Sequence, residues 1–145
     1  MSSAKDLGKQ APRSPRNRLG GYVILARMVD KGRAALAGTA GEYHFACPLD
    51  QLLLGFKEVK DVDVKNQLAA GATDEQIVSW FETHGTKKTK EEIETWSNGL
   101  EAYHPYTDSE RKDWFISECT KTGIKPETSS LFDFLDADDV VSFKK

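Results

Sequence analysis

The chain has 145 residues, of which 39% are hydrophobic and 30% are charged, and its formal net charge is −3. This length and composition are typical of one soluble domain with its own core. The overall acidity argues against a nucleic-acid partner, and two cysteines are too few for a disulfide framework.

The sequence carries no signal for a membrane. No run of about 18 apolar residues occurs, so we expect no transmembrane helix. The N-terminal stretch MSSAKDLGKQ is polar and lacks the apolar region of a signal peptide. We therefore predict a cytoplasmic protein that does not act at a membrane.

The two ends of the chain carry opposite charge. Residues 1–36 hold eight Lys or Arg and two acidic residues, whereas residues 127–139 hold five acidic residues and no Lys or Arg. The simplest expectation is that these ends meet in the fold. The alternative is that the basic end forms a face for an anionic partner.

In chain order, residues 1–10 are small, polar and unpatterned, which predicts a disordered N-terminal tail ahead of a single helical domain at 11–145. Arg13, Arg16 and Arg18 follow in APRSPRNR, just before a predicted helix. Arginines beside a helix N-terminus suit a phosphate or carboxylate, so these three are candidate anion-binding residues. Alternatively, they tie the N-terminal arm to the acidic C-terminal segment.

The longest helical pattern is LGGYVILARMVDKGRAAL, residues 19–36, which is apolar around most of its circumference. Such a helix is usually packed on several sides, so we place it at the centre of a bundle. Its polar strip contains Arg27, Asp30 and Lys31, which either pair among themselves or face a ligand. Arg33, at the edge of the apolar arc, should reach the surface or meet a carboxylate.

Further helices are predicted after the loop that follows Gly38. Pro48 suits the first position of one helix, and capping boxes begin others at Thr73, Thr89 and Thr107. A short helix is expected between them at about 62–70, and a last one within SSLFDFLDADDVVSF, whose VVSF could be extended. The predicted fold class is therefore an all-α, single-domain bundle of about six helices around the central helix at 19–36.

Three stretches, PRSPRNRLGGYVILARMVDKGRA, GEYHFACPLDQ and LFDFLDADDVVSF, resemble a family of small bacterial proteins, domain of unknown function family 5069. They cover about a third of the chain. The resemblance implies a compact, stand-alone helical domain in bacteria. It implies no particular reaction.

Candidate chemistry is concentrated around Cys47, which precedes Pro48 at a predicted helix N-terminus, where the helix field favours a thiolate. His44 lies three residues before it, and a Cys/His pair could support nucleophilic catalysis if the two side chains come within hydrogen-bond reach. Glu42, His44, Cys47 and Asp50 are also weak candidate metal ligands, because they offer suitable ligand types without a CxxC or HxxxH pattern. The alternative is that these residues only anchor the loop.

Two functional hypotheses remain. The first is a binding or interaction module for an anionic small molecule or a protein partner, engaging Arg13, Arg16, Arg18, Arg27 and Lys31. The second is a small enzyme that uses Cys47 with His44, or the strip containing Arg27 and Asp30. The sequence leaves the cofactor, the oligomeric state and the biological process open.

Overall fold

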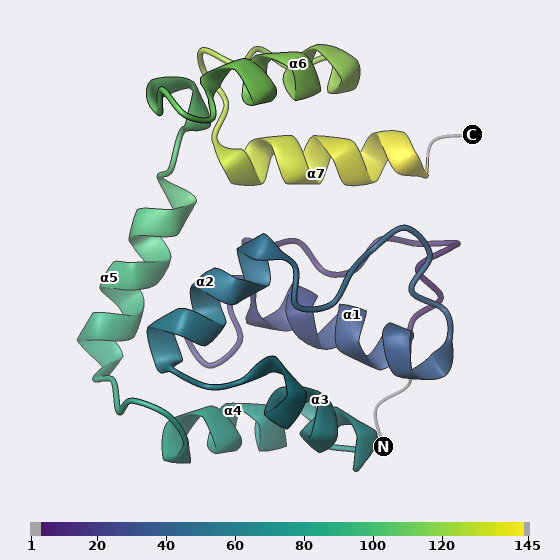
Figure 1. The fold of residues 1–145 in the computed structure, drawn as a ribbon, viewed down its shortest axis with the longest axis vertical. Helices are drawn as coiled ribbons and strands as arrows, with labels where there is room; N and C mark the ends of the chain where they lie inside the picture. The colour runs from purple at the N-terminus through teal and green to yellow at the C-terminus, as the bar shows by residue number, and fades with distance from the viewer. Residues whose placement is uncertain (1–3, 144–145) are drawn as a thin grey trace.

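The computed structural model describes residues 4–143, which form seven α-helices, one 3₁₀ helix and no extended strand. The helices are α1 (Leu25–Ala37), α2 (Pro48–Lys57), α3 (Asp61–Ala69), α4 (Asp74–Thr83), α5 (Lys90–Glu101), η1 (Pro105–Thr107), α6 (Lys112–Thr122) and α7 (Leu131–Ser142). The all-α, single-domain prediction is confirmed. In Figure 1, α1 to α4 form one group, α5 leads away from α4, and α6 and α7 form a pair at the opposite end.

The predicted helix at 19–36 begins six residues later than expected, at Leu25. Gly20 and Gly21 have positive φ angles of 62° and 88°, and Leu19 and Tyr22 form an isolated antiparallel bridge. A left-handed backbone cannot continue into a right-handed helix, so residues 19–24 form a turn before α1. The apolar pattern predicted burial correctly, because Tyr22 and the two residues after it are buried, but it did not reveal this turn.

The predicted tail at residues 1–10 also requires a correction. Residues 1–3 lie outside the described part of the chain, but Lys5 and Leu7 contact the segment after α1, although residues 8–10 are exposed. Leu7 is only 1% exposed, and its N–H donates to the carbonyl of Thr39 over 2.8 Å. The Thr39 hydroxyl donates to the carbonyl of Lys5 over 2.9 Å. Leu7 is the only large apolar residue between residues 4 and 10, and one such residue is too weak a pattern to predict this contact.

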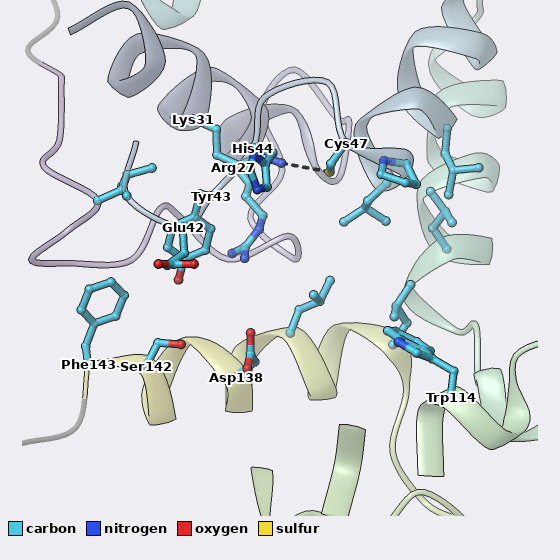
Figure 2. Close-up of a pocket in the computed structure, with 18 of the residues that line it drawn as sticks. Arg27, Lys31, Glu42, Tyr43, His44, Cys47, Trp114, Asp138, Ser142 and Phe143 are labelled. Atoms are coloured by element: carbon cyan, nitrogen blue, oxygen red, sulfur yellow. Dashed lines mark hydrogen bonds between the residues drawn. The ribbon is translucent and has the colours of Figure 1, made fainter. Parts of the chain in front are cut away.

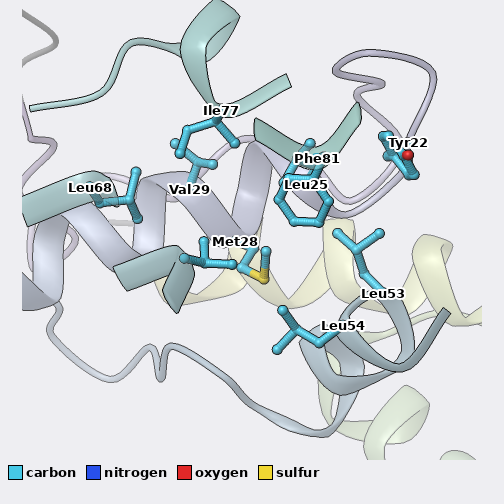
Figure 3. Close-up of a cluster of buried hydrophobic side chains, with 10 residues drawn as sticks. Tyr22, Leu25, Met28, Val29, Leu53, Leu54, Leu68, Ile77 and Phe81 are labelled. Carbon is cyan, nitrogen blue, oxygen red and sulfur yellow. The ribbon is translucent and has the colours of Figure 1, made fainter. Parts of the chain in front are cut away.

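The main core lies between α1 and helices α2, α3 and α4 (Figure 3). It contains Leu25, Met28 and Val29 from α1, together with Leu53, Leu54, Leu68, Ile77 and Phe81. Gly32 allows α3 to approach α1 closely, because a Cβ built there would lie 2.5 Å from Leu68 Cδ1. Two smaller clusters extend the core toward α7, one around Phe132 and the other around Phe115 and Phe134.

The two charged ends of the chain meet, as the charge distribution predicted. Arg16 pairs with Asp133 and with Asp136, whose Oδ2 lies 3.1 Å from Arg16 Nε. Ser14 donates to Asp136 over 2.7 Å. The acidic segment is itself helical, and a capping box at Ser130 begins α7. The VVSF stretch is therefore not extended, since α7 continues to Ser142.

The third predicted capping box, at Thr107, does not begin a helix. The Thr107 hydroxyl donates to the carbonyl of His104 over 2.8 Å, and α6 begins only at Lys112. The other two boxes, at Thr73 and Thr89, both form as predicted. Within residues 4–143 no helix has both the length and the apolar character needed to cross a membrane.

Candidate functional site

A cavity of about 910 Å³ lies between α7 and the wall formed by α1, the loop at 41–47 and the start of α2 (Figure 2). Much of its surface is apolar, with contributions from Leu49, Leu52, Leu100, Trp114, Leu131 and Leu135. Its polar side chains include Arg27, Lys31, His44, Cys47 and Asp138. The cavity thus collects residues from both ends of the chain.

A buried ion pair supports the wall of the cavity at the start of α2. Lys31 Nζ lies 2.9 Å from Asp50 Oδ2, and these side chains are 4% and 0% exposed. Asp50 Oδ2 also accepts from the N–H of Ala46, which fixes the loop before α2. Burial raises the pKa of Asp50 despite the Lys31 charge, and Asp50 Oδ1 has no hydrogen-bond partner among residues 4–143.

Cys47 lies on the same wall and contacts the same lysine. It is the N-cap residue of α2, and Pro48 occupies the first helical position, as predicted. Lys31 Nζ donates to Cys47 Sγ over 3.2 Å, the contact drawn as a dashed line in Figure 2. Cys47 is partly exposed and lines the cavity. Its sulfur therefore contacts the buried Lys31 cation on one side and can be reached from the cavity on the other.

A second buried ion pair joins α1 to α7. Arg27 donates to the two carboxylate oxygens of Asp139 over 2.7 and 3.1 Å and to the carbonyl of Arg13 over 3.3 Å. The Tyr43 hydroxyl donates to Asp139 as well, over 2.8 Å. Burial, together with this hydrogen bond and the charge of Asp139, raises the pKa of Tyr43. This pair fixes the distance between the two walls.

Asp138 gives the α7 wall of the cavity a negative charge, in contrast to the positive charge of Lys31 on the opposite wall. The residue is exposed at the edge of the cavity, and no Lys, Arg or His within residues 4–143 forms an ion pair with it. Partial burial of its carboxyl group, with repulsion from Asp139 and Glu118, raises the pKa of Asp138. An anion is therefore less favoured beside α7 than beside Lys31.

The five cations predicted to bind an anion do not form one site. Arg27 and Lys31 line the cavity, and Arg18 lines a second, separate cavity. Arg13 and Arg16 line neither: Arg13 is bonded to Asp30 and Asp74, and Arg16 to the acidic residues of α7. Arg16 thus ties the N-terminal arm to the acidic C-terminal segment, as the alternative predicted, whereas Arg13 attaches the arm to α1 and α4.

The predicted catalytic residues are only partly brought together. Cys47 and His44 line the same cavity, but within residues 4–143 no hydrogen bond joins them, and Cys47 bonds to Lys31 instead. Asp30 does not line the cavity, because it accepts from Arg13 and pairs with Lys5. Arg27 and Asp30 therefore interact with different partners and do not act on one cavity.

The four weak metal-ligand candidates do not converge. No group of three His, Cys, Asp or Glu side chains within the described residues could hold a metal ion. Asp50 instead faces Lys31 and the Ala46 backbone. The residues that sequence reasoning missed are those of the opposite wall, chiefly Trp114, Leu135 and Asp138, because no local pattern shows that α6 and α7 return to α1.

Comparison with known proteins identifies one family. The sequence model of Domain of unknown function (DUF5069) matches residues 9–141, and the chain belongs to this family. None of the curated proteins compared with the chain matches it.

Proposed function

We propose that this member of the family is a binding module whose cavity takes a small anionic molecule with a largely apolar body. The observation that carries the proposal is the presence of two buried cations with unused N–H groups in the wall of a mainly apolar cavity. The cavity volume of about 910 Å³ falls within the range of roughly 300–1,000 Å³ that is typical of small-molecule sites. A volume of this size favours a small molecule over a protein partner.

The unused donors can be counted. Within the described residues, Arg27 uses three of its five N–H groups, on Asp139 and the carbonyl of Arg13. Lys31 directs its ammonium group to Asp50 and Cys47, which leaves one of its three N–H groups. A carboxylate, sulfonate or phosphate could accept from these groups without breaking either ion pair.

The two walls favour one orientation of the ligand. In Figure 2, Lys31 and Cys47 lie across the cavity from Asp138. The anionic group would meet Lys31 and Arg27, while the apolar body would extend along Leu52, Leu135 and Trp114. Asp138 would repel an anion placed the other way round.

The charge preference is tested with two fluorescent dyes, 1-anilinonaphthalene-8-sulfonate and its uncharged analogue N-phenyl-1-naphthylamine. We expect the sulfonate to bind more tightly and its affinity to fall with salt, because only the sulfonate can use the cationic wall. Equal affinities, or tighter binding of the neutral dye, would contradict the anionic preference.

Two variants separate the ammonium group from its counter-charge. Asp50→Asn keeps the Lys31 cation and removes the carboxylate, so it should bind the sulfonate dye more tightly. The double variant Lys31→Met with Asp50→Asn removes both charges and avoids a buried unpaired carboxylate, so it should bind the dye about tenfold more weakly than Asp50→Asn. Similar affinities for these two variants would exclude Lys31 from the site.

The second candidate function is thiol chemistry at Cys47, favoured by its contact with Lys31 at the cavity wall. We expect iodoacetamide to alkylate Cys47 in the folded protein and not Cys119, which is 0% exposed. The double variant at Lys31 and Asp50 should slow this alkylation severalfold, since a cationic donor favours thiolates. Mass spectrometry after tryptic digestion measures the alkylation rate of Cys47 in the wild-type protein and in the double variant. An unchanged rate would argue against a catalytic use of the pair.

A further inference from the structure

A second cavity, of about 510 Å³, lies where the Gly20–Gly21 turn, the end of α2 and the start of α5 come together. Its lining has more cations than anions. Arg18, Lys57, Lys87, Lys88 and Lys90 face two carboxylates, Glu82 and Glu94. None of these residues belongs to the first cavity.

Lys57 is the unusual member of this group because its side chain is buried and forms no ion pair within the described residues. The residue is only 1% exposed, and its ammonium group donates to the carbonyl of Thr86 over 2.8 Å. None of the ion pairs within residues 4–143 includes Lys57. Burial, and then the nearby charge of Lys88, lowers the pKa of Lys57, and the charge of Glu82 offsets only part of this. Burying an unpaired charge is costly, so the arrangement would be stabilised by an anion.

Local contacts position Lys57, Lys88 and Lys90 around this cavity. The N–H of Thr86 donates to the carbonyl of Lys57 over 2.7 Å, which attaches the segment between α4 and α5 to the end of α2. Lys88 Nζ lies 4.6 Å from the centre of the Phe56 ring. Lys90 is the first residue of α5, which places its charge beside the cavity.

We propose that this second cavity binds a phosphate group, carried either by inorganic phosphate or by a small phosphorylated molecule. A phosphate offers several acceptor oxygens and up to two negative charges, which suits ammonium groups supplied by separate segments. The lysines would surround the phosphate as point charges, with Lys57 at the inner end and Lys87 and Lys90, which are exposed, at the outer edge. The site is independent of the function proposed for the first cavity.

The test is a titration of the full chain with inorganic phosphate at constant ionic strength, followed by backbone amide NMR. We expect saturable shifts at Gly20, Gly21 and Lys88, and none at Gly38. Lys57→Met should weaken phosphate binding about tenfold or more, because it removes the buried charge and keeps the apolar stem. A parallel titration with glycerol 3-phosphate distinguishes the two sources, since tighter binding assigns the cavity to a phosphorylated molecule and equal binding assigns it to the free ion.

Two double variants of exposed lysines, one beside the cavity and one far from it in sequence, test the proposal even if Lys57→Met does not fold. Lys87→Ala with Lys90→Ala removes two exposed charges beside the cavity and should weaken phosphate binding about fivefold. Lys121→Ala with Lys125→Ala removes the same charge from α6 and the segment after it, and should leave binding unchanged. Absence of saturable shifts in the wild-type protein, or equal affinities for the two double variants, would overturn the proposal.

Discussion

Asp74 lies between two guanidinium groups, those of Arg13 and Arg33, each 2.9 Å from one of its oxygens. Burial opposes ionisation, but the hydrogen bonds and charges of Arg13 and Arg33 outweigh it and lower the pKa of Asp74 below its ordinary value of 3.8. A lowered pKa means that the carboxylate stabilises the fold at neutral pH. That contribution is lost as the pH falls through the lowered pKa.

Asp74→Asn should therefore destabilise the protein at neutral pH and less so in acid. We expect the difference in free energy of unfolding between wild type and variant to be constant from pH 7 to about pH 5 and to shrink below about pH 4. Urea unfolding at several pH values measures this difference. If the difference grew toward low pH, the assignment of Asp74 as an ionised partner of both arginines would be wrong.

The ion pairs that α7 forms with Arg27 of α1 and with Arg16 of the N-terminal arm should differ in strength according to burial. Arg27 and Asp139 have side chains that are 5% and 9% exposed, whereas Arg16 and Asp136 are each 38% exposed. Arg27→Met leaves Asp139 buried without its cation and should cost about 3–5 kcal/mol of unfolding free energy. Arg16→Met should cost less than about 1 kcal/mol, because water screens an exposed pair. Chemical denaturation compares the two, and equal costs would contradict this reading of burial.

The partners of charged side chains could be predicted from the sequence where the distribution of charge along the chain indicated them. The opposite charges of the two ends predicted the contact between Arg16 and Asp136. For Arg33 the sequence left two alternatives open, the surface or a carboxylate, and the structure has the second of them, Asp74. The partner of Lys31 could not be predicted, because Asp50 is a first-turn residue of α2 and its burial depends on the packing of α2 against α1.

At the scale of helices, Gly32 explains how α1 and α3 pack. A Cβ at this position would meet Leu68 at 2.5 Å and Phe45 at 3.1 Å. Gly32→Ala gains about 1 kcal/mol of helix propensity, but forcing these side chains apart costs roughly 1–3 kcal/mol. We expect a net loss of about 1 kcal/mol in unfolding free energy.

Gly99, in α5, provides the matched control, because outside the backbone of α5 itself no described atom lies within 4 Å of a Cβ built there. Gly99→Ala should stabilise the protein by about 0.5–1 kcal/mol through propensity alone. Thermal or urea unfolding of both variants is sufficient. Stabilisation by both substitutions would show that α1 and α3 are not in close contact.

Helix boundaries were predictable where a local signal decides them. Pro48 and the capping boxes at Thr73 and Thr89 each begin the predicted helix. The start of α1 was not predictable in this way, because the left-handed turn at Gly20 and Gly21 follows a helical apolar pattern. At Thr107 a contact with His104 replaces the predicted cap, and the sequence gives no measure of that competition.

For the whole molecule, the sequence predicted the fold class, the meeting of the charged ends and one wall of the candidate site. The opposite wall comes from α6 and α7, which are separated from α1 by more than half of the chain. Periodicity describes one element at a time, so it could not show that these helices enclose a cavity. The binding proposal rests on this cavity, which only the three-dimensional structure reveals, and its test is whether a ligand enters the cavity.

The most direct test of the account is a titration of the sulfonate dye into two tryptophan variants. Leu52 lines the cavity and is 47% exposed, whereas Leu36 is 44% exposed and does not line it. Leu52→Trp should occupy the cavity and weaken dye binding about tenfold, and Leu36→Trp should bind the dye as the wild-type protein does. If both variants bound the dye with wild-type affinity, the cavity between α7 and α1 would not be the binding site.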